Sequence, residues 1–106
     1  MDEDVVFHAL ADTSRRAMLD RLKARDGQTL GELEEGFKMT RQAVAKHLAV
    51  LEAANLVATL RRGREKLHFL NPVPIHAIVE RWIAEFRKPA LDALAKLKHD
   101  LEGESL

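Results

Sequence analysis

The sequence of 106 residues contains no cysteine, which excludes disulfide bonds, thiolate metal sites and cysteine nucleophiles. It has no tyrosine, one tryptophan and five glycines, and those glycines form no loop of the kind that cradles a phosphate. No apolar run approaches the length that spans a bilayer, and the N-terminus, Met1-Asp2-Glu3-Asp4, is acidic where a signal peptide would be basic. We therefore expect a soluble, cytoplasmic protein with no membrane partner.

The sequence also lacks an excess of either charge, since Lys and Arg number 17 and Asp and Glu number 17. The distribution is nevertheless uneven. Residues 1–37 carry 5 basic and 9 acidic side chains, residues 38–70 carry 7 and 2, and residues 71–106 carry 5 and 6, so their net charges are −4, +5 and −1. Because local potential rather than net charge steers a polyanion, the basic middle third favours a nucleic-acid partner.

Apolar residues make up 46% of the chain and charged residues 32%, a balance typical of one globular domain. Apolar periodicity predicts a short opening helix around Val5, Val6 and Leu10, and a second helix that Asp12-Thr13-Ser14 caps and Asp26-Gly27 ends. A very short strand at Thr29-Leu30 and a short helix from Leu30 to Phe37 follow. A helix over about 40–54, capped by Thr40, precedes a β-hairpin over about 56–70. A long helix over about 74–101 follows, which Pro89 must kink or divide.

This order of elements predicts a mainly α-helical protein with a small β-hairpin. Two short helices joined by a tight turn and followed by a hairpin describe a winged helix-turn-helix domain, here over 1–106. The long C-terminal helix is additional to that core. Asn55 is expected to end the helix of residues 40–54, because asparagine tolerates the left-handed conformation that glycine usually supplies there.

A helical wheel separates the helix over 40–54 into two sides. Val44, Leu48 and Leu51 share one narrow arc that is expected to pack on the domain. The opposite stripe consists of side chains suited to base edges and phosphates, with small alanines between them: Arg41, Gln42, Ala45, Lys46 and Ala49. Only Glu52, at the far end, is acidic, so the N-terminal half is the part predicted to enter a DNA groove. An ordinary solvated surface is the alternative interpretation of this stripe.

The predicted hairpin has a basic tip formed by Arg61, Arg62, Arg64 and Lys66 around Gly63. Lysines often protect hairpin edges against aggregation, but three arginines beside a glycine turn fit a phosphate or minor-groove contact better. His47 borders the apolar arc of the wheel, so a partly buried histidine bonded to a neighbour is as reasonable as one that contacts DNA. His68, on the hairpin, has the same two interpretations.

The segments Thr40–Leu48 (TRQAVAKHL) and Val50–Val57 (VLEAANLV) resemble the recognition helix of the ArsR (arsenical-resistance repressor) family. Phe7–Asp12 with Arg15-Arg16 is similar to the family's opening, and Arg61-Arg62-Gly63-Arg64 is similar to its wing. The resemblance implies a homodimeric, DNA-binding transcriptional regulator, most often a bacterial repressor. Its base-reading positions fall on Arg41, Gln42, Ala45 and Lys46, where Ala45 replaces the usual serine. The full set expected to contact double-stranded DNA is Thr40, Arg41, Gln42, Ala45, Lys46, His47, Arg61, Arg62, Arg64 and Lys66.

Metal-sensing members of that family carry a cysteine box in the third helix, whereas this sequence has Leu30-Gly31-Glu32-Leu33-Glu34-Glu35 there. His76 and Glu80, four residues apart, could share a metal with a partner chain, but two ligands are too few and such pairs are more often surface contacts. We therefore expect no metal and no cofactor. The sequence does not indicate the effector, the operator or the regulated genes.

The C-terminal helix supplies a reason to dimerise, because its apolar stripe exceeds what a small core needs. The residues expected at a homodimer interface are Val5, Val6, Ile78, Trp82, Phe86, Leu94 and Leu97, unless the helix folds back on its own domain. Two other functions stay open. A winged helix could bind proteins without binding specific DNA, although aromatic residues and methionine would then be expected on the stripe. An enzyme is not expected, because the histidines are scattered without a nucleophile or carboxylate partner.

Overall fold

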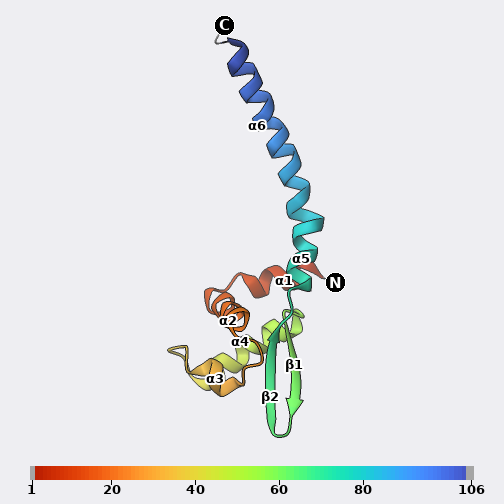
Figure 1. Cartoon of the computed structure of the whole chain (residues 1–106). Helices are drawn as coiled ribbons and strands as arrows, with labels where there is room; N and C mark the ends of the chain where they lie inside the picture. The colour runs from red at the N-terminus through yellow and green to blue at the C-terminus, as the bar shows by residue number, and fades with distance from the viewer. Residues whose placement is uncertain (1, 105–106) are drawn as a thin grey trace. The chain divides into compact units, whose positions relative to one another are not determined.

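The computed structural model describes residues 2–104 and divides the chain into two compact units, Met1–Ile75 and His76–Leu106. The elements follow one another as α1 (Glu3–Leu10), α2 (Thr13–Ala24), α3 (Leu30–Glu34), α4 (Arg41–Ala53), β1 (Val57–Arg62) and β2 (Glu65–Leu70). Three consecutive helical segments complete the chain, namely α5 (Val73–Ile78), the π-helical η1 (Val79–Ile83) and α6 (Ala84–Glu104) (Figure 1). The predicted mainly α-helical fold with a small hairpin is confirmed.

The first unit packs α1 to α4 and the hairpin around one apolar core. Its fully buried side chains include Met18, Leu22, Leu33, Leu51 and Leu56. In Figure 1 the helices α2, α3 and α4 lie to one side of the hairpin, and α4 contacts α1, α2, α3 and β1. Each buried leucine contributes roughly 1.5–3 kcal/mol relative to exposure, so the position of α4 is fixed by burial.

Side-chain caps define where the helices begin. Asp2, Asp12, Thr29 and Thr40 each accept a hydrogen bond from a backbone N–H in the first turn that follows. At Thr29 the cap is reciprocal, because the Glu32 carboxylate accepts from the Thr29 N–H in return. These four caps satisfy donors that would otherwise lack partners at the helix starts.

The end of α4 depends on Asn55, whose φ of 59° lies in the left-handed region, as predicted. The Leu56 N–H donates to the Leu51 carbonyl oxygen at 2.9 Å, and the Asn55 N–H donates to that of Glu52 at 3.0 Å. This pair of bonds is a Schellman motif, and the buried Leu51 and Leu56 supply its usual apolar contact. The motif reverses the chain directly into β1.

The hairpin is antiparallel, with Val57 opposite Leu70 and Arg62 opposite Glu65. Its two-residue turn begins at Gly63, whose φ of 63° explains why a glycine stands there. Because side chains alternate across a strand, Arg61 and Lys66 share one face of the hairpin and Arg62 lies on the other.

Two local predictions were wrong. The short strand is a single bridge between Gln28 and His68, because Thr29 already caps α3. The third helix ends at Glu34, before Phe37. Of the two outcomes expected at Pro89, a kink or a division, the helix is not divided, because Pro89 lies inside α6. The irregularity comes earlier, in the π-helical turn η1, where the Ala84 N–H donates to the carbonyl oxygen of Val79.

Candidate nucleic-acid interface

The N-terminal half of α4 presents the predicted polar stripe. Val44, Leu48 and Leu51 are buried, whereas Arg41, Gln42, Ala45, Lys46 and Ala49 are all exposed. Thr40 is exposed and serves as the N-cap, its hydroxyl oxygen accepting from the Ala43 N–H at 3.1 Å. No acidic residue lies in the first turn of α4, so the positive end of the helix dipole is not neutralised there.

His47 belongs to a structural cluster rather than to the exposed stripe. Its side chain is 23% exposed, and its Nδ1 lies 3.3 Å from Nη1 of Arg15 and 3.8 Å from the carboxylate of Asp12. Arg15 also donates to the carbonyl oxygens of Ala9 and His8. The cluster therefore fastens α4 to the junction of α1 and α2. This is the partly buried histidine that the wheel allowed, and the observed partners give no support to its expected role in DNA contact.

A hydrogen bond from Arg15 and the nearby His47 side chain also account for one electrostatic feature of this cluster. The pKa of Asp12 is lowered chiefly because its carboxylate accepts the Arg15 backbone N–H, with a further contribution from nearby His47. The carboxylate is thus held charged at the start of α2, where the helix dipole favours a negative group. No local pattern in the sequence predicts this link between Asp12 and α4.

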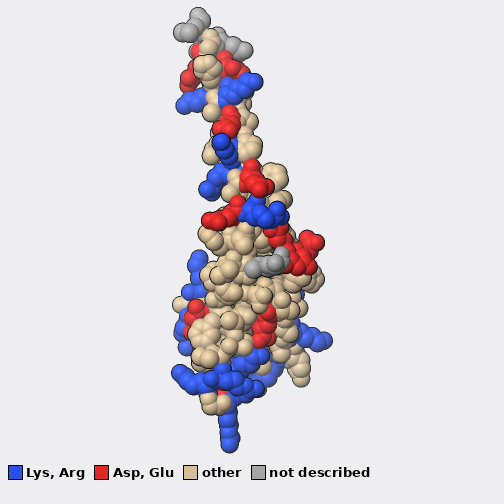
Figure 2. Space-filling model, turned by 90° about the vertical axis from the view of Figure 1, so that its right-hand side faces the viewer, with Lys and Arg blue, Asp and Glu red and all other residues tan. Residues whose placement is uncertain are grey.

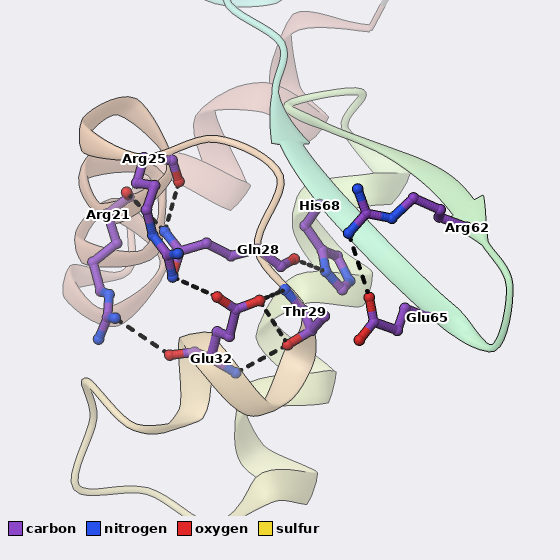
Figure 3. Close-up of polar contacts among 8 residues, drawn as sticks. All are labelled: Arg21, Arg25, Gln28, Thr29, Glu32, Arg62, Glu65 and His68. Atoms are coloured by element: carbon purple, nitrogen blue, oxygen red, sulfur yellow. Dashed lines mark hydrogen bonds and ion pairs between the residues drawn. The ribbon is translucent and has the colours of Figure 1, made fainter.

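The wing is tied to the helices through His68. This side chain is buried, and its Nδ1 lies 2.9 Å from the Gln28 carbonyl oxygen (Figure 3). The Gln28 side-chain amide in turn donates to the carbonyl oxygens of Arg21 and Arg25. His68, which had been one candidate for DNA contact, therefore connects β2 with the end of α2.

The basic residues of the wing are exposed, as predicted for Arg61, Arg62, Arg64 and Lys66. In Figure 2, Lys and Arg side chains gather at the lower end of the first unit, the end that carries the hairpin turn in Figure 1. Lys66 Nζ lies 3.0 Å from the carboxylate of Glu52 on α4. Arg62 approaches Glu65 at 3.7 Å across the strands (Figure 3). The wing and the N-terminal half of α4 thus both present cationic side chains.

A groove of about 440 Å³ lies between α3, α4 and the wing, and both predicted sets of DNA-binding residues contribute to it. Arg41 and Ala45 line it from α4, and Arg64 and Lys66 line it from the hairpin. Its lining also includes Glu52 and Glu65, whose two carboxylates would repel a polyanion. Glu52 lies at the far end of the predicted helix, and no local pattern in the sequence predicts its contact with the wing.

The second unit carries the predicted apolar stripe on its surface. Trp82, Phe86, Leu94 and Leu97 are 44%, 59%, 62% and 54% exposed. The Trp82 and Phe86 rings pack edge to face at a centroid distance of 4.9 Å. Two residues predicted for the dimer interface must be removed from it, because Val6 is 1% and Ile78 is 4% exposed within the chain itself. Val5 remains 38% exposed.

His76 and Glu80 do pair, at 3.1 Å, on an exposed helix surface. Across residues 2–104, no three or more His, Asp or Glu side chains gather closely enough to hold a metal ion. The same part of the chain contains no helix that is both long enough and apolar enough to cross a membrane.

Comparison with known proteins agrees with this geometry. A family profile described as a helix-turn-helix domain matches residues 10–59. An ArsR-like transcriptional regulator from Rhodococcus sp. RHA1 shares the fold with a TM-score of 0.76 and 30% identity, over 94% of this chain and 90% of that one. The chain belongs to the ArsR family of winged helix-turn-helix transcriptional regulators.

Two relatives of known sequence from Bacillus subtilis extend the comparison. The uncharacterised HTH-type transcriptional regulator YuzN is 40% identical over 88 residues, which cover 77% of this chain and 96% of YuzN. The transcriptional repressor SdpR is 31% identical over 81 residues, which cover 76% of this chain and 88% of SdpR. This ArsR-family chain is accordingly a DNA-binding transcriptional regulator.

Proposed function

We propose that this ArsR-family chain is a homodimeric repressor that inserts the N-terminal half of α4 into the major groove. The observation that carries the proposal is the exposed stripe of Arg41, Gln42, Ala45 and Lys46 on a helix whose other side is buried. Arginine and glutamine form bidentate hydrogen bonds with guanine and adenine, respectively, and Lys46 reaches guanine or phosphate. The two exposed alanines keep the centre of the stripe thin enough for the backbone to approach the groove floor.

The wing supplies contacts that carry no base sequence. Arg61, Arg62, Arg64 and Lys66 lie on both faces and at the turn of the hairpin, where they meet phosphates or the minor groove beside the helix. Such contacts add affinity for DNA of any sequence. In the proposed interface, α4 selects the base sequence and the wing adds affinity for DNA of any sequence.

Dimerisation follows from the limits of a single recognition helix, which touches only a few base pairs. Two copies present two such helices to half-sites separated by about one helical turn, roughly 34 Å. The exposed stripe of Trp82, Phe86, Leu94 and Leu97 is the surface proposed for the second copy. Occupation of a promoter by the dimer then lowers transcription, as the name of the repressor SdpR suggests for that relative.

The test is a selection of duplexes from a random DNA pool, followed by footprinting of the selected sequence. Wild-type protein is expected to protect two major-groove segments. Gln42→Ala is expected to weaken binding to the selected sequence by about 1–3 kcal/mol and to broaden its sequence preference. Gln42 is exposed and uncharged, so its replacement by alanine changes no charge of the interface. Unchanged affinity and preference in Gln42→Ala would exclude α4 as the reading helix.

A further inference from the structure

Carboxylates of the same chain already hold three cations of the proposed DNA interface. Arg41 Nε lies 3.1 Å from Glu34, Lys66 Nζ lies 3.0 Å from Glu52, and Arg62 lies 3.7 Å from Glu65. The first two pairs are the shorter ones and join different elements. They connect α3 with α4, and α4 with the wing. A base edge that binds Arg41, or a phosphate that binds Lys66, must therefore compete with a carboxylate that is already in place.

The pair between Arg41 and Glu34 bends the arginine back over α3. A methyl group added at Gly31 would lie 3.1 Å from Nη2 of Arg41, so the guanidinium rests against the backbone of α3. Arg41 Nε is at the same time engaged by the carboxylate of Glu34, whose side chain is 35% exposed. The Arg41 side chain, which is 62% exposed, is thus directed towards α3, although it is a residue predicted to read a base.

The pair between Lys66 and Glu52 is the less exposed of the two. The Glu52 side chain is 28% exposed and that of Lys66 is 45% exposed. When Lys66 moves to a phosphate, Glu52 stays in the groove between α4 and the wing without its cation, close to a polyanion. Repulsion between Glu52 and the phosphates, or uptake of a salt cation by Glu52, then opposes binding.

We propose that Glu34 and Glu52 set the DNA affinity of this protein by competing with DNA for Arg41 and Lys66, respectively. The inference rests on the proposed DNA interface and adds two residues that do not touch DNA themselves. Since both carboxylates oppose the cations whatever the base sequence is, their effect applies to DNA of any sequence. They therefore keep the protein from binding the bulk of genomic DNA as tightly as its basic residues would allow.

The test compares Glu34→Gln and Glu52→Gln with Glu35→Gln by fluorescence anisotropy on a short mixed-sequence duplex, at several salt concentrations. Glu35 is exposed and forms no ion pair within residues 2–104, so Glu35→Gln makes the same charge change without releasing a cation. Glu34→Gln and Glu52→Gln are each expected to bind about two- to fivefold tighter than Glu35→Gln. For Glu52→Gln the slope of log affinity against log salt is expected to steepen by about one.

A double-mutant comparison separates release of the cation from simple removal of a negative charge. In a Lys66→Met background, Glu52→Gln is expected to gain no more affinity than Glu35→Gln in that background. Three results would overturn the inference and leave the proposed interface intact. Glu52→Gln could bind DNA no tighter than Glu35→Gln, or more weakly than it. Alternatively, the gain in affinity from Glu52→Gln could persist in the Lys66→Met background. Failure of the wild type to bind the duplex at low salt would instead overturn the proposed interface, and the inference with it.

Discussion

At the scale of single residues, the basic side chains of the interface differ in what they are expected to do. Arg62 lies on the face of the hairpin opposite Arg61 and Lys66, and its ion pair with Glu65 is long and exposed. Such pairs are worth little, so Arg62 is available to a phosphate. Arg41 and Gln42 sit at the start of α4, where base edges are expected.

Arg62→Ala is expected to weaken binding to selected and mixed-sequence DNA by the same factor, because phosphate contacts carry no sequence information. The salt slope is expected to fall by about one. Titrations of both duplexes at several salt concentrations measure this. Arg41→Ala serves as the comparison, since it should weaken the selected sequence more than the mixed one. A larger loss on the selected duplex for Arg62→Ala would assign base reading to the wing.

Glu32 gives rise to a prediction about pH. Its pKa is lowered chiefly by the hydrogen bond from the Thr29 backbone N–H and then by that from Arg25. Because the folded state holds this carboxylate charged more strongly than the unfolded chain does, the stabilisation is complete above the ordinary pKa of a glutamate. It is lost as the pH falls through that value towards the lowered one.

Unfolding by denaturant near neutral pH and in mild acid tests this expectation. The wild type is expected to lose stability on acidification, and Glu32→Gln is expected to lose less over the same range. Glu35→Gln, which changes an exposed neighbour, should follow the wild type. If Glu32→Gln and Glu35→Gln have the same pH dependence, the cap of α3 contributes nothing to it.

At the scale of elements, the end of α4 determines how the chain enters the wing. Asn55 adopts a φ of 59°, and the conformation costs about 1–2 kcal/mol for a residue with an ordinary side chain. Asn55→Ala is therefore expected to lower the free energy of unfolding by about 1 kcal/mol, and Asn55→Gly to preserve or raise it. The Asn71 side chain bonds the Asn55 carbonyl oxygen, which both variants retain.

Thermal and denaturant unfolding of the two variants measure the difference. Ala53→Gly, an exposed change in the last turn of α4, is the control and is expected to destabilise by about 1 kcal/mol. The opposite responses of residues 53 and 55 to glycine would identify the left-handed position. Destabilisation by Asn55→Gly as large as that by Ala53→Gly would contradict the role given to the Schellman motif.

The elements also show which features sequence could predict. Periodicity located α4 and its buried arc because Val44, Leu48 and Leu51 repeat at helical spacing. The Gly63 turn located the hairpin for an equally local reason. By contrast, the bond between His68 and Gln28 joins residues 40 positions apart, and the ion pair between Lys66 and Glu52 joins residues 14 positions apart. No local pattern encodes such pairings, and the same is true of the burial of Val6 and Ile78.

The C-terminal segment also has features that local sequence patterns do not predict. Proline removes a backbone donor, so Pro89 was expected to kink or divide the helix, and α6 is not divided there. The π-helical turn at Val79–Ile83 has no signature of its own in the sequence. The exposed stripe on this segment was predicted from spacing alone, but its occupant remains part of the proposal.

At the scale of the whole molecule, the salt dependence of binding reports how many phosphates are engaged. If a dimer neutralises roughly eight phosphates, the slope of log affinity against log salt is expected near −7. Titrations of the wild type on its selected duplex measure the slope. A slope near zero would mean that the cations of α4 and the wing do not contact phosphate, whatever the affinity.

The proposed dimer can be tested by substitutions on the exposed apolar stripe of the second unit. Leu94→Lys combined with Leu97→Lys places two charges on the exposed stripe and is expected to convert the dimer to a monomer. The first unit should remain folded, because its core contains neither residue. Lys98→Leu, a change beside the stripe, is the control and should leave the dimer intact. Sedimentation compares the masses of these proteins.

The most direct test of the account is the number of protomers and of protected groove segments on one selected duplex. Footprinting combined with sedimentation of the complex measures both. The account predicts two chains of 12.0 kDa on each duplex, with two protected major-groove segments centred about one turn (~34 Å) apart. A single chain with one protected segment, or protection unchanged in Gln42→Ala, would contradict it.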